Sequence, residues 1–109
     1  MIYELRVYRA MPGRLPDVLA RFKDHTTGIW ERLGIQTTGF WTTLVGGSEI
    51  GELTYLIAWA SLADRETRWA SFLADEEWHR VKAETEKNGP IVADIQNKLL
   101  TPTAFSKLQ

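Results

Sequence analysis

His25 is the best single candidate for a functional residue, because an imidazole ring can gain or lose a proton near neutral pH. It lies in a stretch, 14–33, whose apolar residues recur at helical spacing. We place its ring at the edge of the apolar stripe, beside a basic flank that we interpret as a solvated edge: Arg14, Arg21 and Arg32. A histidine that simply hydrogen-bonds to a neighbour is the more common explanation for such a position.

Arg6 and Glu4 form a second candidate, because they are two residues apart in a strand predicted over 2–9 and so share one of its faces. Ile2 and Tyr8 share that face. Arg6 could bind the anionic group of a ligand. The alternative, which we prefer, is a buried ion pair between Arg6 and Glu4 that reaches across a dimer.

Tryptophan is the one residue type in excess, with five copies. Trp30, Trp69 and Trp78 fall on predicted helices, where they are expected to pack in the core. Trp41 and Trp59 fall on predicted strands, and at least one of these two could line a cavity.

Glu76 and His79 match half of a di-iron carboxylate motif, which needs a second such pair and two further carboxylates. The chain has no cysteine, phosphate-binding loop, dinucleotide fingerprint or nucleophile motif. We therefore expect no metal and no cofactor, and we interpret the Glu76–His79 pair as part of a solvated helix face.

Seven predicted elements position these residues. After the first strand come a helix over 14–33 ending at Gly34, a strand over 39–45, a turn at Gly46-Gly47 and a strand over 52–60. A helix capped by Ser61, a short helix from Asp75 to about Asn88, and a strand over 91–100 complete the chain. This order predicts one α+β domain over 1–109, a ferredoxin-like β-α-β-β-α-α-β unit with a four-stranded antiparallel sheet.

The sheet is expected to need a partner. The strand over 52–60 is apolar on both sides, although helices in such a unit cover only one face. We place the mixed face of the first strand, with Glu4 and Arg6, on the uncovered side. A second copy of the chain is the simplest cover, so we predict a homodimer with a cavity.

Charge and composition exclude several classes of partner. The net charge of −1 gives no general attraction to nucleic acid or to an anionic membrane. No apolar run approaches the roughly 20 residues that a membrane span requires. No leader pattern precedes the first strand. We expect a cytoplasmic protein with no nucleic-acid partner and no membrane span.

Five segments resemble the NIPSNAP family in residue sequence, order and spacing: Ile2–Tyr8, Gly39–Thr43, Glu52–Trp59, Asp75–Trp78 and Leu100–Ser106. The resemblance extends over nearly the whole chain. It implies a dimeric α/β barrel, in agreement with the predicted elements. It supplies no agreed catalytic motif that could be transferred residue by residue.

Two classes of function follow. In the first, a homodimer binds a small apolar or aromatic ligand in a mostly apolar cavity, with these candidate lining residues: Arg6, Tyr8, His25, Trp41, Tyr55 and Trp59. In the second, the chain is a cofactor-free monooxygenase or a haem-degrading oxygenase, by analogy with other dimeric α/β barrels. That alternative would bring His25, Asn97 and Trp59 into one pocket.

Overall fold

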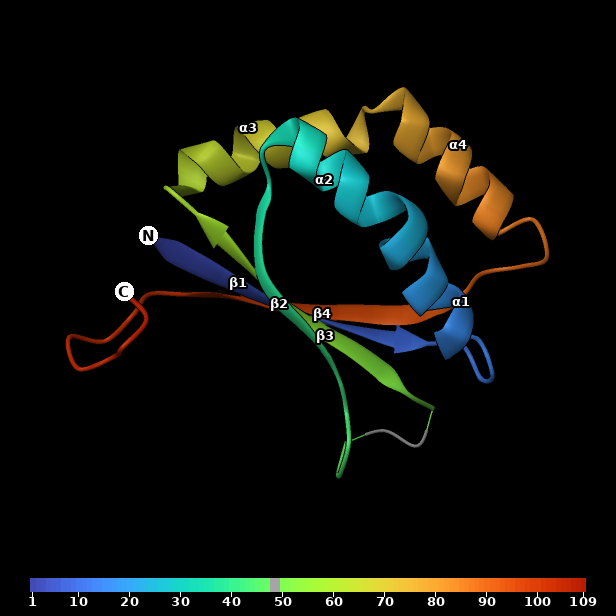
Figure 1. Cartoon of the computed structure of the whole chain (residues 1–109), viewed down its shortest axis with the longest axis horizontal. Coiled ribbons are helices and arrows are strands. Elements are labelled where there is room, and N and C mark those ends of the chain that lie inside the picture. The colour runs from blue at the N-terminus through green and yellow to red at the C-terminus, as the bar shows by residue number, and fades with distance from the viewer. Residues whose placement is uncertain (48–49) are drawn as a thin grey trace.

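A computed structural model describes residues 1–47 and 50–109 of the chain. Along this described part the elements run in the following order: β1 (Ile2–Ala10), α1 (Leu15–Arg21), the π-helical segment η1 (Phe22–Thr26), α2 (Thr27–Leu33), β2 (Gln36–Thr42), β3 (Glu52–Trp59), α3 (Leu62–Leu73), α4 (Glu76–Thr85) and β4 (Val92–Leu100). Figure 1 shows the helices as one layer over one face of the sheet. The predicted turn at Gly46-Gly47 falls in the connection between β2 and β3.

The sheet has the strand order β2-β3-β1-β4, and every pair is antiparallel. The central strand β1 pairs Leu5 with Leu56 of β3 on one side and with Lys98 of β4 on the other. The predicted α+β, ferredoxin-like fold is therefore confirmed. No helix in the described part of the chain is long and apolar enough to cross a membrane.

The helix predicted over 14–33 forms as one continuous rod with a π-helical turn in its middle. In that turn the backbone N–H of Thr27 donates to the carbonyl of Phe22, five residues earlier, and the Thr27 hydroxyl donates to the same carbonyl at 2.9 Å. The rod ends at Gly34, whose φ of 75° is the left-handed conformation that glycine adopts without strain. The predicted C-cap is confirmed.

Both predicted helix starts in the second half of the chain are confirmed by their capping bonds. The Ser61 hydroxyl accepts from the N–H of Asp64, and the Asp75 carboxylate accepts from the N–H of Trp78, each at 3.0 Å. Helix α4 ends at Thr85 rather than near Asn88, because the chain turns tightly before Gly89.

The second strand lies three residues earlier than predicted, over 36–42 instead of 39–45. Ile35 is buried and follows the Gly34 cap directly, so the chain enters the sheet at once. Beyond Thr42 the chain leaves the sheet, and Leu44 is almost fully exposed. The aromatic and β-branched composition of 39–45 correctly indicated a strand but misplaced both of its ends.

The prediction of which face of β1 is uncovered was wrong. Glu4, Arg6 and Tyr8 are buried beneath the helices, while Leu5 and Val7 face the uncovered side and are half-buried. Alternation shows that two faces differ, but it does not show which of them meets the helices. The polar face is the inner one because side chains from other elements satisfy its charges.

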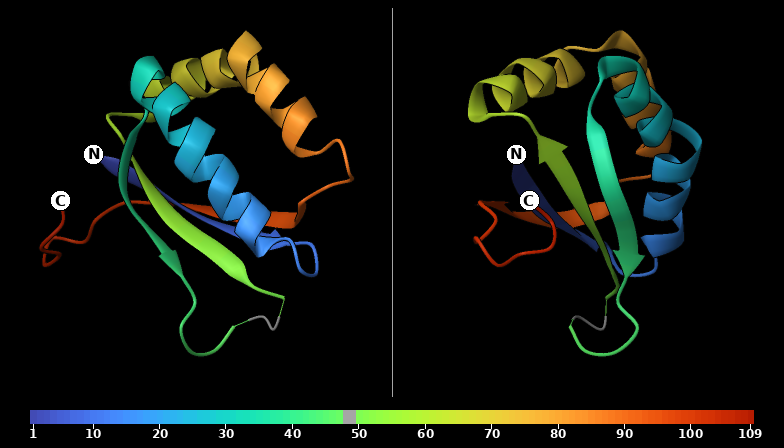
Figure 2. Two further views of the ribbon diagram at one scale, coloured as in Figure 1. Left: turned by 45° about the vertical axis from the view of Figure 1, so that its right-hand side comes forward. Right: turned by 60° about the vertical axis from the view of Figure 1, so that its left-hand side comes forward.

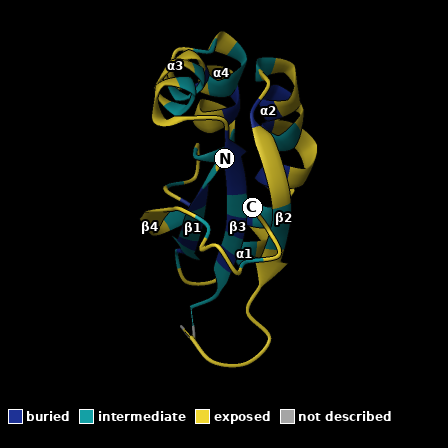
Figure 3. Cartoon of the chain, turned by 90° about the vertical axis from the view of Figure 1, so that its left-hand side faces the viewer, coloured by how far each residue is buried: buried dark blue, intermediate teal, exposed yellow. Residues whose placement is uncertain are grey.

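The core between helices and sheet is built largely from aromatic rings. Tyr55 of β3 lies at its centre, with ring centroids 5.3 Å from Phe22 and Phe40 and 5.4 Å from Trp30 and Tyr8. Figure 3 shows the two central strands as mostly buried and β2 as mostly exposed. This packing fixes β1 and β3 against the helices and so positions the inward-facing side chains of both strands.

The outer face of the sheet has no layer of helices over it in either view of Figure 2. The C-terminal segment folds back over one end of this face, where the Tyr3 hydroxyl donates to the Gln109 carbonyl at 2.8 Å. A depression of about 320 Å³ lies between that segment and the strands, lined by Leu56, Leu100 and Pro102 among others.

Candidate functional site

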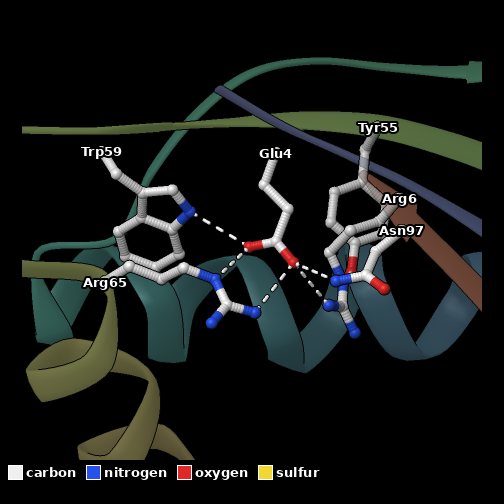
Figure 4. Close-up of polar contacts among 6 residues, drawn as sticks. All are labelled: Glu4, Arg6, Tyr55, Trp59, Arg65 and Asn97. Atoms are coloured by element: carbon white, nitrogen blue, oxygen red, sulfur yellow. Dashed lines mark hydrogen bonds and ion pairs between the residues drawn. The ribbon is translucent and has the colours of Figure 1, made fainter. Parts of the chain in front are cut away.

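Glu4 holds together a buried polar network that joins four elements (Figure 4). Its carboxylate accepts two hydrogen bonds from Arg65 of α3, at 2.8 and 3.1 Å, and one from Arg6 at 2.9 Å. Asn97 of β4 and the indole N–H of Trp59 donate at 2.8 and 3.1 Å. Glu4 has no exposed surface, so these contacts replace its hydration entirely.

The network determines the charge of Glu4. Burial by itself would raise the pKa of this carboxyl, but the hydrogen bonds from Arg65, Asn97 and Arg6 outweigh burial and lower the pKa to about 2. Glu4 is therefore ionised at neutral pH and is a very weak base. The geometry assigns it a structural role, as the anion that holds Arg6 and Arg65 in place.

Arg6 is the member of the network that lines a cleft. Its Nε donates to the Tyr55 hydroxyl at 2.8 Å, and its Nη1 donates to Glu4. The guanidinium lies 4.6 Å from the centroid of the Trp69 ring, which is a cation–π distance. Burial raises the pKa of Tyr55 well above its usual range, so this residue stays neutral and holds Arg6 in one orientation.

A cleft of about 440 Å³ opens beside Arg6, between the inner face of the β1–β4 edge and helices α3 and α4. We call it the aromatic cleft, and its lining comprises Arg6, Tyr8, Arg21, Trp69, Phe72, Leu73, Trp78, Lys82, Glu86, Val92, Ala93, Asp94 and Ile95. Three of its rings form a row, with Phe72 5.2 Å from Trp69 and 4.8 Å from Trp78. The cleft thus combines an aromatic wall with a fixed cation, which suits a small ligand.

The structure brings some of the predicted site residues together. Arg6 and Tyr8 line the aromatic cleft, and Tyr55 lies directly behind Arg6. Trp59 is fully buried against Glu4, and Asn97 binds the same carboxylate. The Arg6–Glu4 pair lies within one chain, so the expectation of a pair across a dimer was wrong.

Two other predicted residues lie elsewhere. His25 is exposed and borders a small depression of about 220 Å³ with Asp17, Asp24 and Thr85 of α4. Trp41 lies on the outer face of the sheet, opposite Thr54, with 54% of its surface exposed. Neither residue lines the aromatic cleft.

Most residues of the cleft were not predicted to lie there, and three of them had been placed elsewhere. Trp69 and Trp78 were assigned to the core, and Arg21 to a solvated edge. Arg21 is in fact buried, with 5% of its surface exposed, and its guanidinium lies 5.1 Å from the Trp78 ring centroid. The row of Trp69, Phe72 and Trp78 spans two helices that a sequence cannot orient, so only the residue types could have indicated it.

Glu76 and His79 belong to no metal-binding cluster among the described residues. The described residues contain no group of three or more His, Cys, Asp or Glu side chains that could hold a metal ion. The His79 ring nitrogen Nε2 instead lies 2.7 Å from the Leu73 carbonyl oxygen. Glu76 lies exposed at the start of α4.

A larger depression, of about 770 Å³, lies at the other end of the helix layer, between α2, β2 and Arg68 of α3. Arg68 is engaged there, because it donates to the Leu33 carbonyl at 3.0 Å and pairs with Asp64 at 2.7 Å. Exposed threonines and Gln36 supply much of the remaining lining. It lacks the aromatic wall and the clustered cations that distinguish the aromatic cleft.

The fold and the cleft define an α+β, ferredoxin-like domain with a ligand-sized space between its two layers. The family model NIPSNAP matches residues 3–107, which is nearly the whole chain. The chain therefore belongs to the NIPSNAP family, and the resemblance seen in its sequence is confirmed. A search among curated proteins finds no match to this chain.

Solved structures agree with this assignment. A NIPSNAP family protein with unknown function from Agrobacterium tumefaciens is 30% identical, with a TM-score of 0.84 over 100% of this chain and 94% of that chain. A second NIPSNAP family protein from the same organism is 24% identical, with a TM-score of 0.86 over 99% and 98%. An antibiotic biosynthesis monooxygenase is similar in fold alone, at 13% identity and a TM-score of 0.60 over 94% and 99%.

Proposed function

We propose that this chain is a small-molecule-binding domain, which holds an apolar or aromatic ligand in the aromatic cleft and acts as a homodimer. The observation that carries the proposal is the row of Trp69, Phe72 and Trp78 beside the buried Arg6. Aromatic rings next to polar groups held in fixed positions are typical of small-molecule sites. Trp69 and Trp78 remain partly accessible at the two ends of the row. The volume of about 440 Å³ is in the range of known ligand pockets.

Arg6 supports the proposal because its position is fixed before any ligand arrives. Glu4 and Tyr55 each accept one of its hydrogen bonds, and Trp69 packs against its guanidinium. A group held in this way loses little conformational freedom on binding, so the cost of ordering the site is already met by the fold.

The oxygenase alternative has weaker support. It requires His25, Asn97 and Trp59 in one pocket, but His25 is exposed and borders a separate depression. Trp59 and Asn97 donate to Glu4 and are occupied in the network. The likeness to an antibiotic biosynthesis monooxygenase is one of fold alone. Ligand binding is the function that the arrangement of these residues supports best.

The homodimer is supported by the outer face of the sheet, which carries half-buried Leu5, Val7 and Leu56 and the exposed Trp41. A soluble chain seldom leaves a contiguous apolar patch of this kind in contact with water. The same face of a second copy, related by a two-fold axis, would cover it.

Ligand binding can be tested with N-phenyl-1-naphthylamine, an uncharged aromatic probe that fluoresces in apolar sites. We expect a saturable fluorescence increase with the wild-type chain. Ile95→Trp should weaken this binding by about tenfold or more, because Ile95 lines the cleft and a larger ring would fill it.

The matched control is Leu62→Trp, which adds the same ring at an exposed position on α3 outside the cleft. It should bind the probe as the wild type does. Absence of saturable binding to the wild type, or equal binding by the Ile95→Trp variant, would contradict the proposed function.

A further inference from the structure

The charged side chains around the aromatic cleft are unbalanced toward positive charge. The acidic residues of its lining are already engaged: Asp94 pairs with Arg9 at 3.0 Å, and Glu86 lies 3.4 Å from Arg21. Lys82 also lines the cleft and has no ion pair among the described residues. Behind the cleft, the single charge of Glu4 is shared between Arg6 and Arg65. An anion is therefore the species that this site would attract.

Arg21 is the buried cation of the cleft whose hydrogen bonds are least complete. It is almost fully buried, yet its Nε has no hydrogen-bond partner in the described part of the chain. Its Nη1 makes only long contacts of 3.4 Å, to Thr85 and Glu86. Burial lowers the pKa of this guanidinium, which Glu86 only partly offsets. A buried donor without a partner is costly, so an acceptor placed in the cleft would be stabilised here.

The two arginines and the rings lie in one continuous lining. The Arg6 guanidinium packs on Trp69 and the Arg21 guanidinium on Trp78, and Phe72 joins the two tryptophans. The planar fork of a guanidinium matches the two oxygens of a carboxylate. The apolar part of the same molecule would then lie along the ring row.

We propose that the ligand of the aromatic cleft is a small apolar or aromatic carboxylate, bound through Arg21 and Arg6 with its apolar part against Trp69, Phe72 and Trp78. This inference rests on the proposed function, since it names the chemical class of the ligand for the same cleft.

The test is a competition experiment in which N-phenyl-1-naphthylamine reports on the cleft. The competitors are 1-naphthaleneacetate and 1-naphthaleneacetamide, which share their rings and differ in charge. We expect the carboxylate to displace the probe at a concentration about tenfold or more below that of the amide. Acetate, which has the charge without the rings, should displace nothing at the same concentrations.

The Arg21→Gln variant tests whether Arg21 is the residue that causes the preference for the carboxylate. It should remove most of the roughly tenfold preference for the carboxylate over the amide. Lys23→Gln removes the same charge at an exposed position two residues away and should behave as the wild type. Thermal unfolding of each variant verifies that it is folded. The wild-type comparison of acid and amide needs no variant, so it tests the preference for a carboxylate even if Arg21→Gln does not fold.

The outcomes separate the two proposals. Equal displacement by acid and amide, no displacement by either while the reporter is bound, or a preference that survives in folded Arg21→Gln would overturn the assignment of a carboxylate to Arg21. Each of these leaves the ligand-binding function standing. If the reporter itself fails to bind the wild type, both proposals are overturned.

Discussion

Glu4 illustrates at the scale of single residues how a buried charge is satisfied by hydrogen bonds. Five hydrogen bonds satisfy its carboxylate, and their donors come from β1, β3, α3 and β4. The pKa of Glu4 is about 2 in the folded chain, against an ordinary value of 4.5. The ionised carboxylate is thus more stable in the folded state than in the unfolded state. The free energy of unfolding therefore depends on pH.

We predict that about 3 kcal/mol of unfolding free energy is fully present above pH 4.5 and is lost as the pH falls toward 2. Stability falls with falling pH because the pKa of Glu4 is lower in the folded state. As the pH falls, the unfolded chain therefore takes up this proton before the folded chain does. Chemical denaturation at several pH values measures this loss. Glu4→Gln should flatten the curve in that window, whereas the exposed Glu66→Gln should not.

Carboxyl NMR of the wild type provides an independent measurement. The Glu4 signal should titrate with a midpoint near 2. A midpoint near 4.5 would show that the network does not stabilise the ionised form. This measurement does not depend on whether Glu4→Gln folds, since removing one member of a buried ionic network typically costs about 3–5 kcal/mol.

Residue types alone indicated Arg6, Tyr8 and Tyr55 but could not indicate their surroundings. The partners of Glu4 at Arg65 and Asn97 are 61 and 93 residues away in the chain. Such pairs depend on the packing of α3 and β4 against β1, which no local pattern encodes. The same limit explains why Arg21 was interpreted as a solvated residue. Its place among basic residues is visible in the local sequence, whereas its burial results from the packing of α4 against it.

The glycines of the first helical rod supply a prediction at the scale of elements. Gly34 adopts a φ of 75°, and a β-carbon there would meet the Arg68 guanidinium, which binds the Leu33 carbonyl. Gly34→Ala should therefore lower the free energy of unfolding by about 1 kcal/mol or more. Thermal or chemical denaturation measures the change.

Gly28→Ala is the matched control, made six residues earlier in α2. Gly28 has a helical backbone, and a β-carbon there would meet nothing within 4 Å. This variant should raise stability by up to about 1 kcal/mol, because alanine favours the helix. Equal effects of the two substitutions would contradict the role assigned to the Gly34 cap.

Element types and their order were predictable because the signals are local: hydrophobic periodicity, the caps at Ser61 and Asp75, and the Gly34 stop. The ends of β2 were not predictable, because they depend on the burial of Ile35 and on pairing with β3. The inner face of β1 was not predictable either. Its charged residues resembled an exposed surface until Arg65 and Asn97 were placed beside them.

The whole molecule has the shape of an open two-layer slab. Its Cα extents are 45 × 36 × 19 Å, so only one direction is as thin as a sheet with a single layer of helices. The radius of gyration is 14.5 Å, compared with about 13 Å for a closed domain of this length. The sheet thus has one face in the core and one face that, within the described residues, the C-terminal segment alone partly covers.

We predict that this outer face joins two copies of the chain. Light scattering should give about 25 kDa, twice the chain mass of 12.5 kDa, at micromolar concentration. Leu56→Lys places a charge at the centre of the apolar face, opposite Leu5, and should shift the population to monomer because the charge would have to be buried without a partner.

Leu62→Lys introduces the same charge at an exposed position on α3, outside the outer face, and should leave the dimer intact. A wild-type chain that stays at 12.5 kDa would rule out the dimer. Because the aromatic cleft lies on the inner face, the dimer does not build its walls. Leu56→Lys, if it folds as a monomer, should therefore still bind N-phenyl-1-naphthylamine, which separates assembly from ligand binding in a single variant.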